Sequence, residues 1–414
     1  MKNYKELLEE NNQTQISKYI EKANEMQKQN LINQIQELNF EELKKLYKIS
    51  KTTDFNKDIE IEHLKYVDKS KLAKEEFEKL ENIGNEIIKK GQYAVVTMAG
   101  GQGTRLGHDG PKGTFLLNVK PKPKYLFEII ADGLKRANKK YNITLNWYIM
   151  TSTENNKKTV DFFEEHNYFE YPKEHVSFFE QGNLPLLSED GKILIDENMN
   201  VKLAADGNGC IYKAMKKNGV LDDMKSKGIK WIFIGAVDNA LVNMTDPVLL
   251  GLTISQKNEI GSKAIVKSNP HEPVGVFCKK NGKPGVIEYS EISKEMAEAT
   301  DENGELLYGE SNIMAHLYNI NALDKISQTD LPYHSAHKKA NYLKEDGTMF
   351  IATEPNAYKY EAFIFDGFSF FDNMSVLRVR RDENFAPIKN KEGNDSPSTA
   401  IELYNKFWEK EENK

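Results

Sequence analysis

Short apolar runs alternate with amphipathic segments along the chain from residue 93 onward. The apolar runs have the length and β-branched content of buried strands, and the segments between them repeat apolar residues at helical spacing. The strand-like runs are 94–98, 145–151, 175–180, 231–236 and 264–267, and the helix-like segments are 126–137 and 157–166. This alternation predicts an α/β domain on a mixed, mostly parallel sheet, in which ligands bind beyond the carboxyl ends of the strands.

The part of the chain before this domain is highly charged and predicts helices. Asn39 is placed to cap one helix, with Glu42 at the capping-box position. Ser70 is placed to cap another helix at 71–90, which Gly84 could interrupt and which Gly91 could end. We therefore expect an N-terminal helical domain over residues 1–91.

The C-terminal part has a mixed α+β pattern. Residues 375–380 alternate apolar and cationic side chains, which predicts a half-exposed strand, and 397–408 predict a final helix before a frayed charged tail. We accordingly expect a central α/β domain over 92–320 and a C-terminal α+β segment over 321–414.

Composition narrows the possible functions. Lys and Arg number 57 and Asp and Glu 63, which gives a net charge of −6 and argues against a general nucleic-acid binder. The two cysteines do not have the spacing of a zinc site. There is neither an apolar leader nor a run approaching the ~20 apolar residues of a membrane span. These features predict a cytoplasmic protein that binds no membrane, and they leave its oligomeric state open.

The candidate chemistry is concentrated in one glycine-rich stretch, at 93–113, which directly follows the first predicted strand. Glycines allow backbone N–H groups to approach an anion, and Arg105 and Lys112 add two full positive charges. The stretch does not match the P-loop, because its lysine follows a proline, and it misses the dinucleotide fingerprint by one residue. An ordinary glycine-rich turn does not explain the two cations, so we interpret the stretch as a loop that binds a nucleoside triphosphate.

The loop instead fits the nucleotidyltransferase signature G-x-G-T-R-L followed by P-K, with Gly101-Gln-Gly-Thr-Arg-Leu106 and Pro111-Lys112. In its form Ala99-Gly-Gly-Gln-Gly-Thr-Arg-Leu-Gly107 it resembles the eukaryotic-type UDP-N-acetylhexosamine pyrophosphorylases of the UDP-sugar pyrophosphorylase group. Further segments resemble that family in the same order along the chain: Phe178-Phe-Glu-Gln-Gly-Asn-Leu-Pro185, Asp206-Gly-Asn-Gly209, Val237-Asp-Asn239, Asn269-Pro-His-Glu-Pro-Val-Gly-Val276, Val286-Ile-Glu-Tyr-Ser-Glu-Ile292, Ser311-Asn-Ile313, Lys359-Tyr-Glu-Ala-Phe-Ile-Phe-Asp366 and Phe385-Ala-Pro-Ile-Lys-Asn390.

The resemblance implies a Rossmann-like nucleotidyltransferase fold, similar to glycosyltransferase A, and the reaction of UTP with N-acetylglucosamine 1-phosphate to give UDP-N-acetylglucosamine and pyrophosphate. The residues that it implies are Arg105, Lys112 and Lys389 for catalysis; Ala99, Gly100, Gly101, Gln181 and Gly207 for the nucleotide; Asn208, Gly275, Glu288, Asn312, Phe363 and Phe365 for the sugar; and Asp238 for Mg²⁺ or Mn²⁺.

Several alternatives stay open from the residues alone. Asp238 could only cap a turn, Lys389 could be a solvated lysine, and Phe363 and Phe365 have the alternating spacing of core residues. The sugar 1-phosphate could carry GalNAc, glucose or galactose, and the chain could be a non-catalytic regulator that binds a nucleotide sugar.

Overall fold

The computed structural model describes residues 3–51 and 59–413 and divides the chain into two compact units. The smaller unit comprises the described part of Met1–Asp58 together with Gly182–Cys210 and Leu331–Phe363. The larger unit comprises Ile59–Gln181, Ile211–Asp330 and Ile364–Lys414. Each unit is therefore assembled from segments that are far apart in the sequence. The sequence predicted a division into three contiguous segments, 1–91, 92–320 and 321–414. That division along the chain stays a prediction, because the two units are defined by contacts in space.

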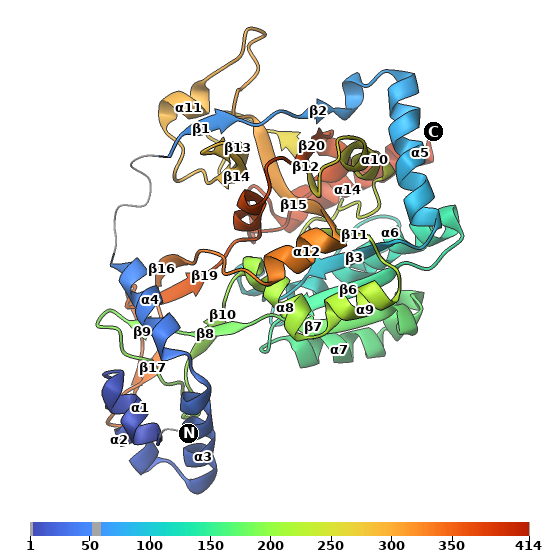
Figure 1. The fold of residues 1–414 in the computed structure, drawn as a ribbon. Helices are drawn as coiled ribbons and strands as arrows, with labels where there is room; N and C mark the ends of the chain where they lie inside the picture. The colour runs from blue at the N-terminus through green and yellow to red at the C-terminus, as the bar shows by residue number, and fades with distance from the viewer. Residues whose placement is uncertain (1–2, 52–58, 414) are drawn as a thin grey trace. The chain divides into compact units, whose positions relative to one another are not determined.

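The larger unit is built on one twisted sheet (Figure 1). Its strands follow the order β2-β20-β12-β15-β11-β3-β6-β7, with β1, β13 and β14 branching from β15. Pairing is parallel between β11, β3, β6 and β7 and between β12, β20 and β2, whereas β15 runs antiparallel to both β11 and β12. The prediction of an α/β fold with a mixed, mostly parallel sheet is confirmed.

These strands span β1 Ile61–His63, β2 Val67–Asp68, β3 Tyr93–Met98, β6 Asn146–Thr151, β7 Val176–Glu180, β11 Trp231–Ala236, β12 Ile260–Val266, β13 Val276–Lys280, β14 Lys283–Ile287, β15 Glu310–Asn319 and β20 Ser375–Arg378. A small hairpin pairs β4 Leu116–Leu117 with β5 Lys124–Tyr125. The helices of this unit are α5 Lys74–Lys89, α6 Leu126–Tyr141, α7 Asn156–Glu165, α8 Ile211–Lys217, α9 Val220–Ser226, α10 Pro247–Ser255, α11 Lys294–Glu298, α12 Ile320–Ser327, α13 Arg381–Asn384 and α14 Pro397–Glu412.

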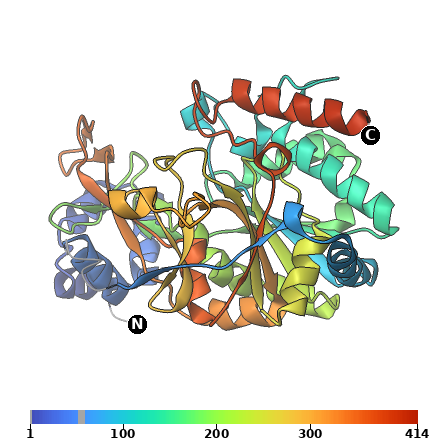
Figure 2. The same cartoon turned by 90° about the horizontal axis from the view of Figure 1, so that it is seen from above.

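Helices cover both faces of the sheet because successive strand residues point to opposite sides. Val95, Trp147 and Phe233 face the core shared with α5, α6, α7, α10 and α14. On the other face, Tyr148 donates a hydrogen bond from its hydroxyl to Asp223 of α9, at 2.6 Å. The C-terminal helix α14 lies alongside α6 (Figure 2). Between these helices, the guanidinium of Arg136 is 4.3 Å from the centre of the Trp408 ring.

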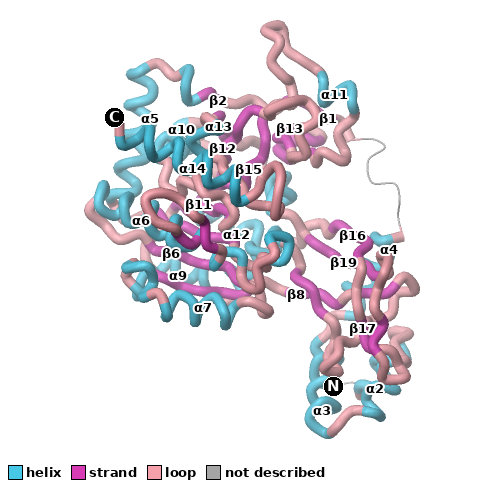
Figure 3. The backbone as a smooth tube through the Cα atoms, turned by 180° about the vertical axis from the view of Figure 1, so that it is seen from behind, coloured by secondary structure: helices cyan, strands magenta, loops and turns pink. Residues whose placement is uncertain are grey.

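The smaller unit combines N-terminal helices with short antiparallel strands (Figure 3). Its helices are α1 Tyr4–Glu10, α2 Ile16–Lys22, α3 Glu25–Glu37 and α4 Phe40–Ser50. Its strand pairs are β8 Asn183–Pro185 with β10 Leu203–Ala205, β19 Ala357–Glu361 with both β9 Leu187–Ser188 and β16 His334–Lys338, and β17 Tyr342–Leu343 with β18 Met349–Phe350. Apolar residues from the helices and from both later segments share one core.

Helix boundaries confirm some local predictions and correct others. The side chain of Asn39 caps α4 by accepting from the Glu42 N–H at 3.1 Å, as expected. Ser70, in contrast, lies in a 3₁₀ turn at Lys69–Lys71, and α5 starts three residues later without a side-chain cap. Gly84 does not interrupt α5, and α14 continues to Glu412 instead of fraying after residue 408.

The predicted half-exposed strand at 375–380 is wrong in its exposure. All four residues of β20 are buried, including Arg378. The guanidinium of Arg378 donates to Glu310 and to Glu305 and lies over the Tyr66 ring. A cation can be buried where carboxylates neutralise it and accept its hydrogen bonds. Among the described residues, no helix combines the length and apolar character that crossing a membrane requires.

Candidate active site

The glycine-rich loop follows β3 at the carboxyl end of the central strands. Its two sides are joined by backbone hydrogen bonds from Gly103 N–H to Gly110 C=O at 2.9 Å and from Lys112 N–H to Gly101 C=O at 3.0 Å. A methyl group at Gly113 would stand only 2.1 Å from the Phe127 ring, so this position has no room for a side chain. The loop is thus a folded hairpin-like structure packed against α6, and its own backbone hydrogen bonds hold its two sides together.

Lys112 and Asp238, which are distant in sequence, form an ion pair of 2.8 Å between Nζ and Oδ2. Lys112 is 8% exposed, and Asp238 stands two residues beyond the end of β11. The strands β3 and β11 are adjacent and parallel, so their carboxyl ends place the two side chains together. Arg105, the other loop cation, is exposed and has no hydrogen-bond or ion-pair partner among the described residues.

Four of the five residues predicted to bind the nucleotide lie at the start of the loop or just beyond β7, which is separated from β3 by β6 in the sheet. Gln181 directly follows β7 and is only 7% exposed. A Cβ at Gly100 would come within 2.8 Å of the Gln181 side-chain oxygen, so only glycine allows this approach. Ala99 is buried and donates its N–H to Met150 C=O at 2.8 Å, whereas Gly101 is exposed and faces open space.

Lys389 lies on a segment that is hydrogen-bonded to the Asp238 loop. The N–H of Ile388 donates to the Asp238 C=O at 2.8 Å. The Lys389 side chain is 38% exposed, and its ammonium stands 4.0 Å from Asp395, its partner in a long ion pair. Lys112, Asp238 and the backbone that carries Lys389 therefore belong to one connected region of the larger unit.

Three predicted sugar-binding residues also meet one another. The N–H of Asn312 in β15 donates to the Gly275 C=O at 2.8 Å. A Cβ at Gly275 would lie 2.8 Å from a carboxylate oxygen of Glu288, which follows β14. Gly275 just before β13, Glu288 just after β14 and Asn312 within β15 are thus brought together although they span almost forty positions of sequence.

The remaining predicted residues are divided between the units. Gly207, Asn208 and Phe363 belong to the smaller unit, where a Cβ at Gly207 would come within 2.3 Å of the Ala362 C=O. The Phe363 ring is tilted against His334 with 4.6 Å between ring centres. Phe365 belongs to the larger unit and is 8% exposed, which fits the core interpretation of its alternating spacing.

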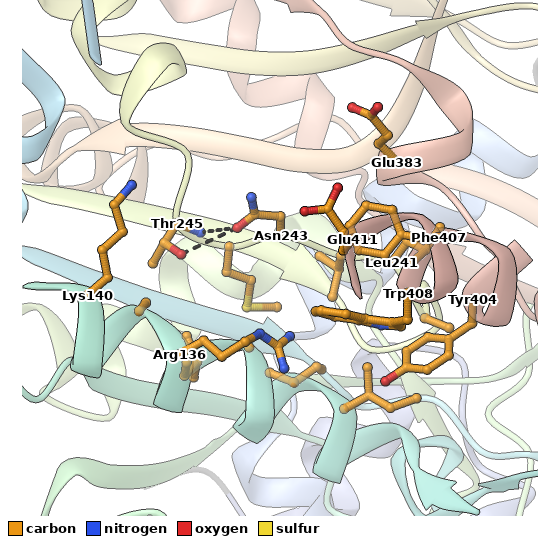
Figure 4. Close-up of a pocket in the computed structure, with 18 of the residues that line it drawn as sticks. Arg136, Lys140, Leu241, Asn243, Thr245, Glu383, Tyr404, Phe407, Trp408 and Glu411 are labelled. Carbon is orange, nitrogen blue, oxygen red and sulfur yellow. Dashed lines mark hydrogen bonds between the residues drawn. The ribbon is translucent and has the colours of Figure 1, made fainter. Parts of the chain in front are cut away.

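A cavity of about 450 Å³ lies elsewhere in the larger unit (Figure 4). None of the predicted site residues lines it. Its walls come from α6, the loop after β11, α13 and α14, and Figure 4 shows Arg136, Asn243 and Trp408 around it. This volume is within the range of small-molecule pockets, but its location separates it from the loop at 99–113.

The described residues contain no group of three or more His, Cys, Asp or Glu side chains that could hold a metal by themselves. Mg²⁺ commonly binds through one or two carboxylates together with substrate phosphates and water. A single partly exposed carboxylate such as that of Asp238, whose side chain is 27% exposed, beside the glycine-rich loop at 99–113 fits that mode.

Three polar residues that hold this region together were not among the predicted site residues. Asn155 donates to the Ala99 C=O at 3.0 Å, Asn239 accepts from the Ala386 N–H at 2.8 Å, and Lys263 lies buried in β12. Two of them left a signal in the sequence: Asn239 belongs to the motif Val237-Asp-Asn239, and a lysine such as Lys263 within an apolar strand is unusual.

Comparison with known proteins assigns the family. The model for the UTP–glucose-1-phosphate uridylyltransferase family matches residues 38–405, most of the chain. This chain belongs to that family. Within the family it is similar to UDP-N-acetylglucosamine pyrophosphorylases, as the resemblance of its motifs implied.

Two relatives and one solved structure illustrate this similarity. A protein of Dictyostelium discoideum described as a probable UDP-N-acetylglucosamine pyrophosphorylase is 36% identical, covering 95% of this chain and 85% of the relative. The UDP-N-acetylglucosamine pyrophosphorylase of Saccharomyces cerevisiae is 42% identical, covering 78% and 70%. The crystal structure of the uridine diphosphate N-acetylglucosamine pyrophosphorylase from Trypanosoma brucei, in complex with an inhibitor, superposes with a TM-score of 0.81 at 30% identity, over 97% of this chain and 84% of that one.

Proposed function

We propose that this protein is a UDP-N-acetylglucosamine pyrophosphorylase: it joins UTP and N-acetylglucosamine 1-phosphate to give UDP-N-acetylglucosamine and pyrophosphate. In addition to the family membership, one observation supports the proposal most directly. Lys112 of the glycine-rich loop is paired with Asp238 at the carboxyl ends of adjacent parallel strands, where α/β folds bind their ligands.

The reaction brings two anionic substrates together, so its main demand on the protein is positioning and charge neutralisation. We assign Arg105 and Lys112 to the triphosphate and to the pyrophosphate that leaves. Lys389 is assigned to the phosphate of the attacking sugar. The exposure of Arg105 and the partial exposure of Lys389 support these assignments, because both cations are open to a ligand.

The uncharged groups of the site are assigned to recognition. Ala99, Gly100 and Gly101 offer backbone to the nucleotide, and the Gln181 amide beside Gly100 offers a donor and an acceptor to a base. Gly207 is assigned to the nucleotide as well. For the sugar, the assignment comprises Asn208, Gly275, Glu288, Asn312, Phe363 and Phe365.

Asp238 is proposed to hold the divalent cation, Mg²⁺ or Mn²⁺, together with substrate phosphates. When bound, such a cation neutralises phosphate charge that develops on the leaving group. Lys112 keeps the Asp238 carboxylate in a fixed orientation by hydrogen bonding, which prepares it for that role.

The simplest mechanism is a direct in-line displacement. An oxygen of the sugar phosphate attacks the α-phosphorus of UTP, the bond between the α- and β-phosphates breaks, and its electrons leave with pyrophosphate. The step needs no nucleophilic side chain. Isolation of a covalent uridylyl-enzyme after mixing with UTP alone would contradict it.

A pyrophosphate-release assay with UTP, Mg²⁺ and a panel of sugar 1-phosphates tests the function. We expect turnover with N-acetylglucosamine 1-phosphate to exceed that with glucose or galactose 1-phosphate. Equal turnover with sugars that lack the N-acetyl group would overturn the sugar assignment. UTP binding without turnover of any sugar would instead indicate a nucleotide-sugar-binding regulator.

A further inference from the structure

A lysine is buried in the middle of β12, where an ammonium group needs compensating partners. Lys263 is 1% exposed, and every other residue of Ile260–Ile265 is also buried. Removing an ammonium from water is costly unless it is paired and hydrogen-bonded. Its partners therefore show what this part of the fold is built to connect.

Lys263 contacts three groups on two different segments. Its Nζ is 3.1 Å from Asp246 Oδ2, donates to the Asn243 C=O at 3.0 Å and donates to Asn384 Oδ1 at 3.2 Å. The Oδ1 of Asn243 also accepts from the N–H of Thr245, which folds this segment into a tight turn (Figure 4). One ammonium thus joins the loop after β11 to the end of α13.

Both segments lead to residues of the proposed active site. Asn243 is five positions after Asp238, and Asn384 is five positions before Lys389. Asn239 strengthens the same connection, since its Nδ2 donates to the Asn384 C=O at 2.7 Å and its Oδ1 accepts from Ala386 N–H. The hydrogen bond from the Ile388 N–H to the Asp238 C=O is a further link between the two segments.

We propose that Lys263 is a positioning residue for uridylyl transfer. It fixes the Asp238 loop against the segment that carries Lys389, and so sets the separation between the groups assigned to the metal and to the sugar phosphate. The inference rests on the proposed function. A purely structural role, in which Lys263 only neutralises the buried carboxylate of Asp246, makes a different experimental prediction.

Lys69 is a matched control because it shares the charge role and lacks the connection. Its Nζ is 3.1 Å from the same oxygen of Asp246, yet it has no contact with Asn243 or Asn384 among the described interactions. Lys69→Met and Lys263→Met each remove one cation from Asp246. Only Lys263→Met also removes the hydrogen bonds that join the loop after β11 to the end of α13.

Steady-state kinetics of both variants distinguish the roles. For Lys263→Met we expect kcat/KM for N-acetylglucosamine 1-phosphate to fall about tenfold or more, because small displacements of reacting groups are costly. The KM for UTP should change by less than about threefold, since the loop at 99–113 is held by other bonds. Lys69→Met should leave both parameters near the parent values. Equal losses in the two variants would overturn the inference.

A double-mutant cycle with Asn384→Ala tests the route of the effect. If Lys263 acts through Asn384, the losses in kcat/KM of the two single variants should not add in the double variant. Additive losses would contradict a connection through this bond. Urea midpoints of all variants identify loss of folding, and if Lys263→Met does not fold, Asn384→Ala alone must still lower kcat/KM for the sugar phosphate.

The parent enzyme separates this inference from the proposed function. Absence of turnover by the parent chain with every sugar 1-phosphate would reject the function. Turnover by the parent together with normal kinetics of Asn384→Ala and Lys263→Met would reject only the positioning role.

Discussion

At the scale of single residues, the charged groups of the proposed site differ in how the fold holds them. Lys112 is nearly buried and hydrogen-bonded to Asp238, whereas Arg105 is exposed. Lys389 lies between these cases, with one distant carboxylate at 4.0 Å. A cation that is held by a hydrogen bond, such as Lys112, is already oriented before the substrate binds. An exposed cation, such as Arg105, is open to contact with the substrate.

The two lysines should affect different substrates. Lys112→Ala should lower kcat/KM for UTP by about a hundredfold, as expected for loss of a preorganised electrostatic contact, and Lys389→Ala should mainly raise the KM for the sugar 1-phosphate. Initial rates with each substrate varied in turn measure both effects. Lys139→Ala, an exposed lysine on α6, is the control. If both site variants have parent kinetics, the assignment of these residues is wrong.

A buried histidine predicts a specific pH dependence of stability. Burial lowers the pKa of His316 to about 3, and its Nδ1 is 2.7 Å from the Ser262 hydroxyl. An unfolded histidine titrates near pH 6.5, so the unfolded state binds the proton first as the pH falls. His316 therefore contributes stability at neutral pH that is lost progressively between about pH 6.5 and 3.

The measurement compares urea unfolding of the parent and His316→Gln at pH 7 and pH 5. From the linkage relation, the parent should lose about 2 kcal/mol more than the variant over this interval. A parallel decline in parent and His316→Gln would mean that the imidazole does not titrate differently in the two states.

At the scale of elements, two glycines allow α5 and α10 to pack at unusually short distance. A Cβ at Gly84 would lie 2.0 Å from the Pro247 C=O, and a Cβ at Gly251 would lie 1.9 Å from the Leu80 C=O. In both cases the atoms that an added Cβ would meet belong to the backbone, so the rotation of a side chain could not relieve the clash. This reciprocal contact explains why a glycine persists within α5 despite its poor helix propensity.

Gly84→Ala should consequently destabilise the larger unit, by about 1–3 kcal/mol, because the helices must separate. Gly133→Ala in α6 is the matched control, since its Cβ would meet only the end of the Arg136 side chain at 3.8 Å. That substitution should be neutral or stabilising by up to about 1 kcal/mol through helix propensity. Chemical denaturation of both variants tests the comparison, and equal effects would refute the packing argument.

The sequence predicted the elements that depend on local patterns and missed features that depend on distant partners. The strand before the glycine loop, the helix α6 and the cap at Asn39 all follow from neighbouring residues. The burial of Arg378 could not be predicted, because its compensating carboxylates lie 68 and 73 positions away. The ion pair of Lys112 with Asp238 spans 126 positions, and only the strand order of the sheet reveals it.

The proposed site residues and the fold were predicted from different kinds of information. Physical patterns alone identified the glycine-rich loop with Arg105 and Lys112 as a candidate for binding phosphates, whereas the sugar-side residues depended on the family resemblance. Their roles remain predictions. The positioning network around Lys263 followed from neither source, since it becomes visible only when β12 and the end of α13 are placed side by side.

At the scale of the whole molecule, activity should depend on a divalent cation. If Asp238 holds the metal together with substrate phosphates, chelation with EDTA should abolish turnover, and added Mg²⁺ or Mn²⁺ should restore it. Asp238→Asn should require a higher metal concentration for half-maximal activity, because the amide is a neutral and weaker ligand. Full activity in excess chelator would exclude the metal role.

The position of β20 has a consequence for how the chain folds during synthesis. This strand, Ser375–Arg378, pairs in parallel with β12 and also with β2, so Val67 of β2 is partnered by Leu377 from near the other end of the chain. Until the segment that carries β20 has been synthesised, β12 lacks the partner on one of its edges and β2 lacks the strand with which it pairs. Contacts of such sequence separation form slowly, and exposed strand edges favour aggregation. The nascent chain therefore completes its central sheet only after Ser375–Arg378 has been synthesised, which makes the pairing of β20 a late step in the folding of the larger unit.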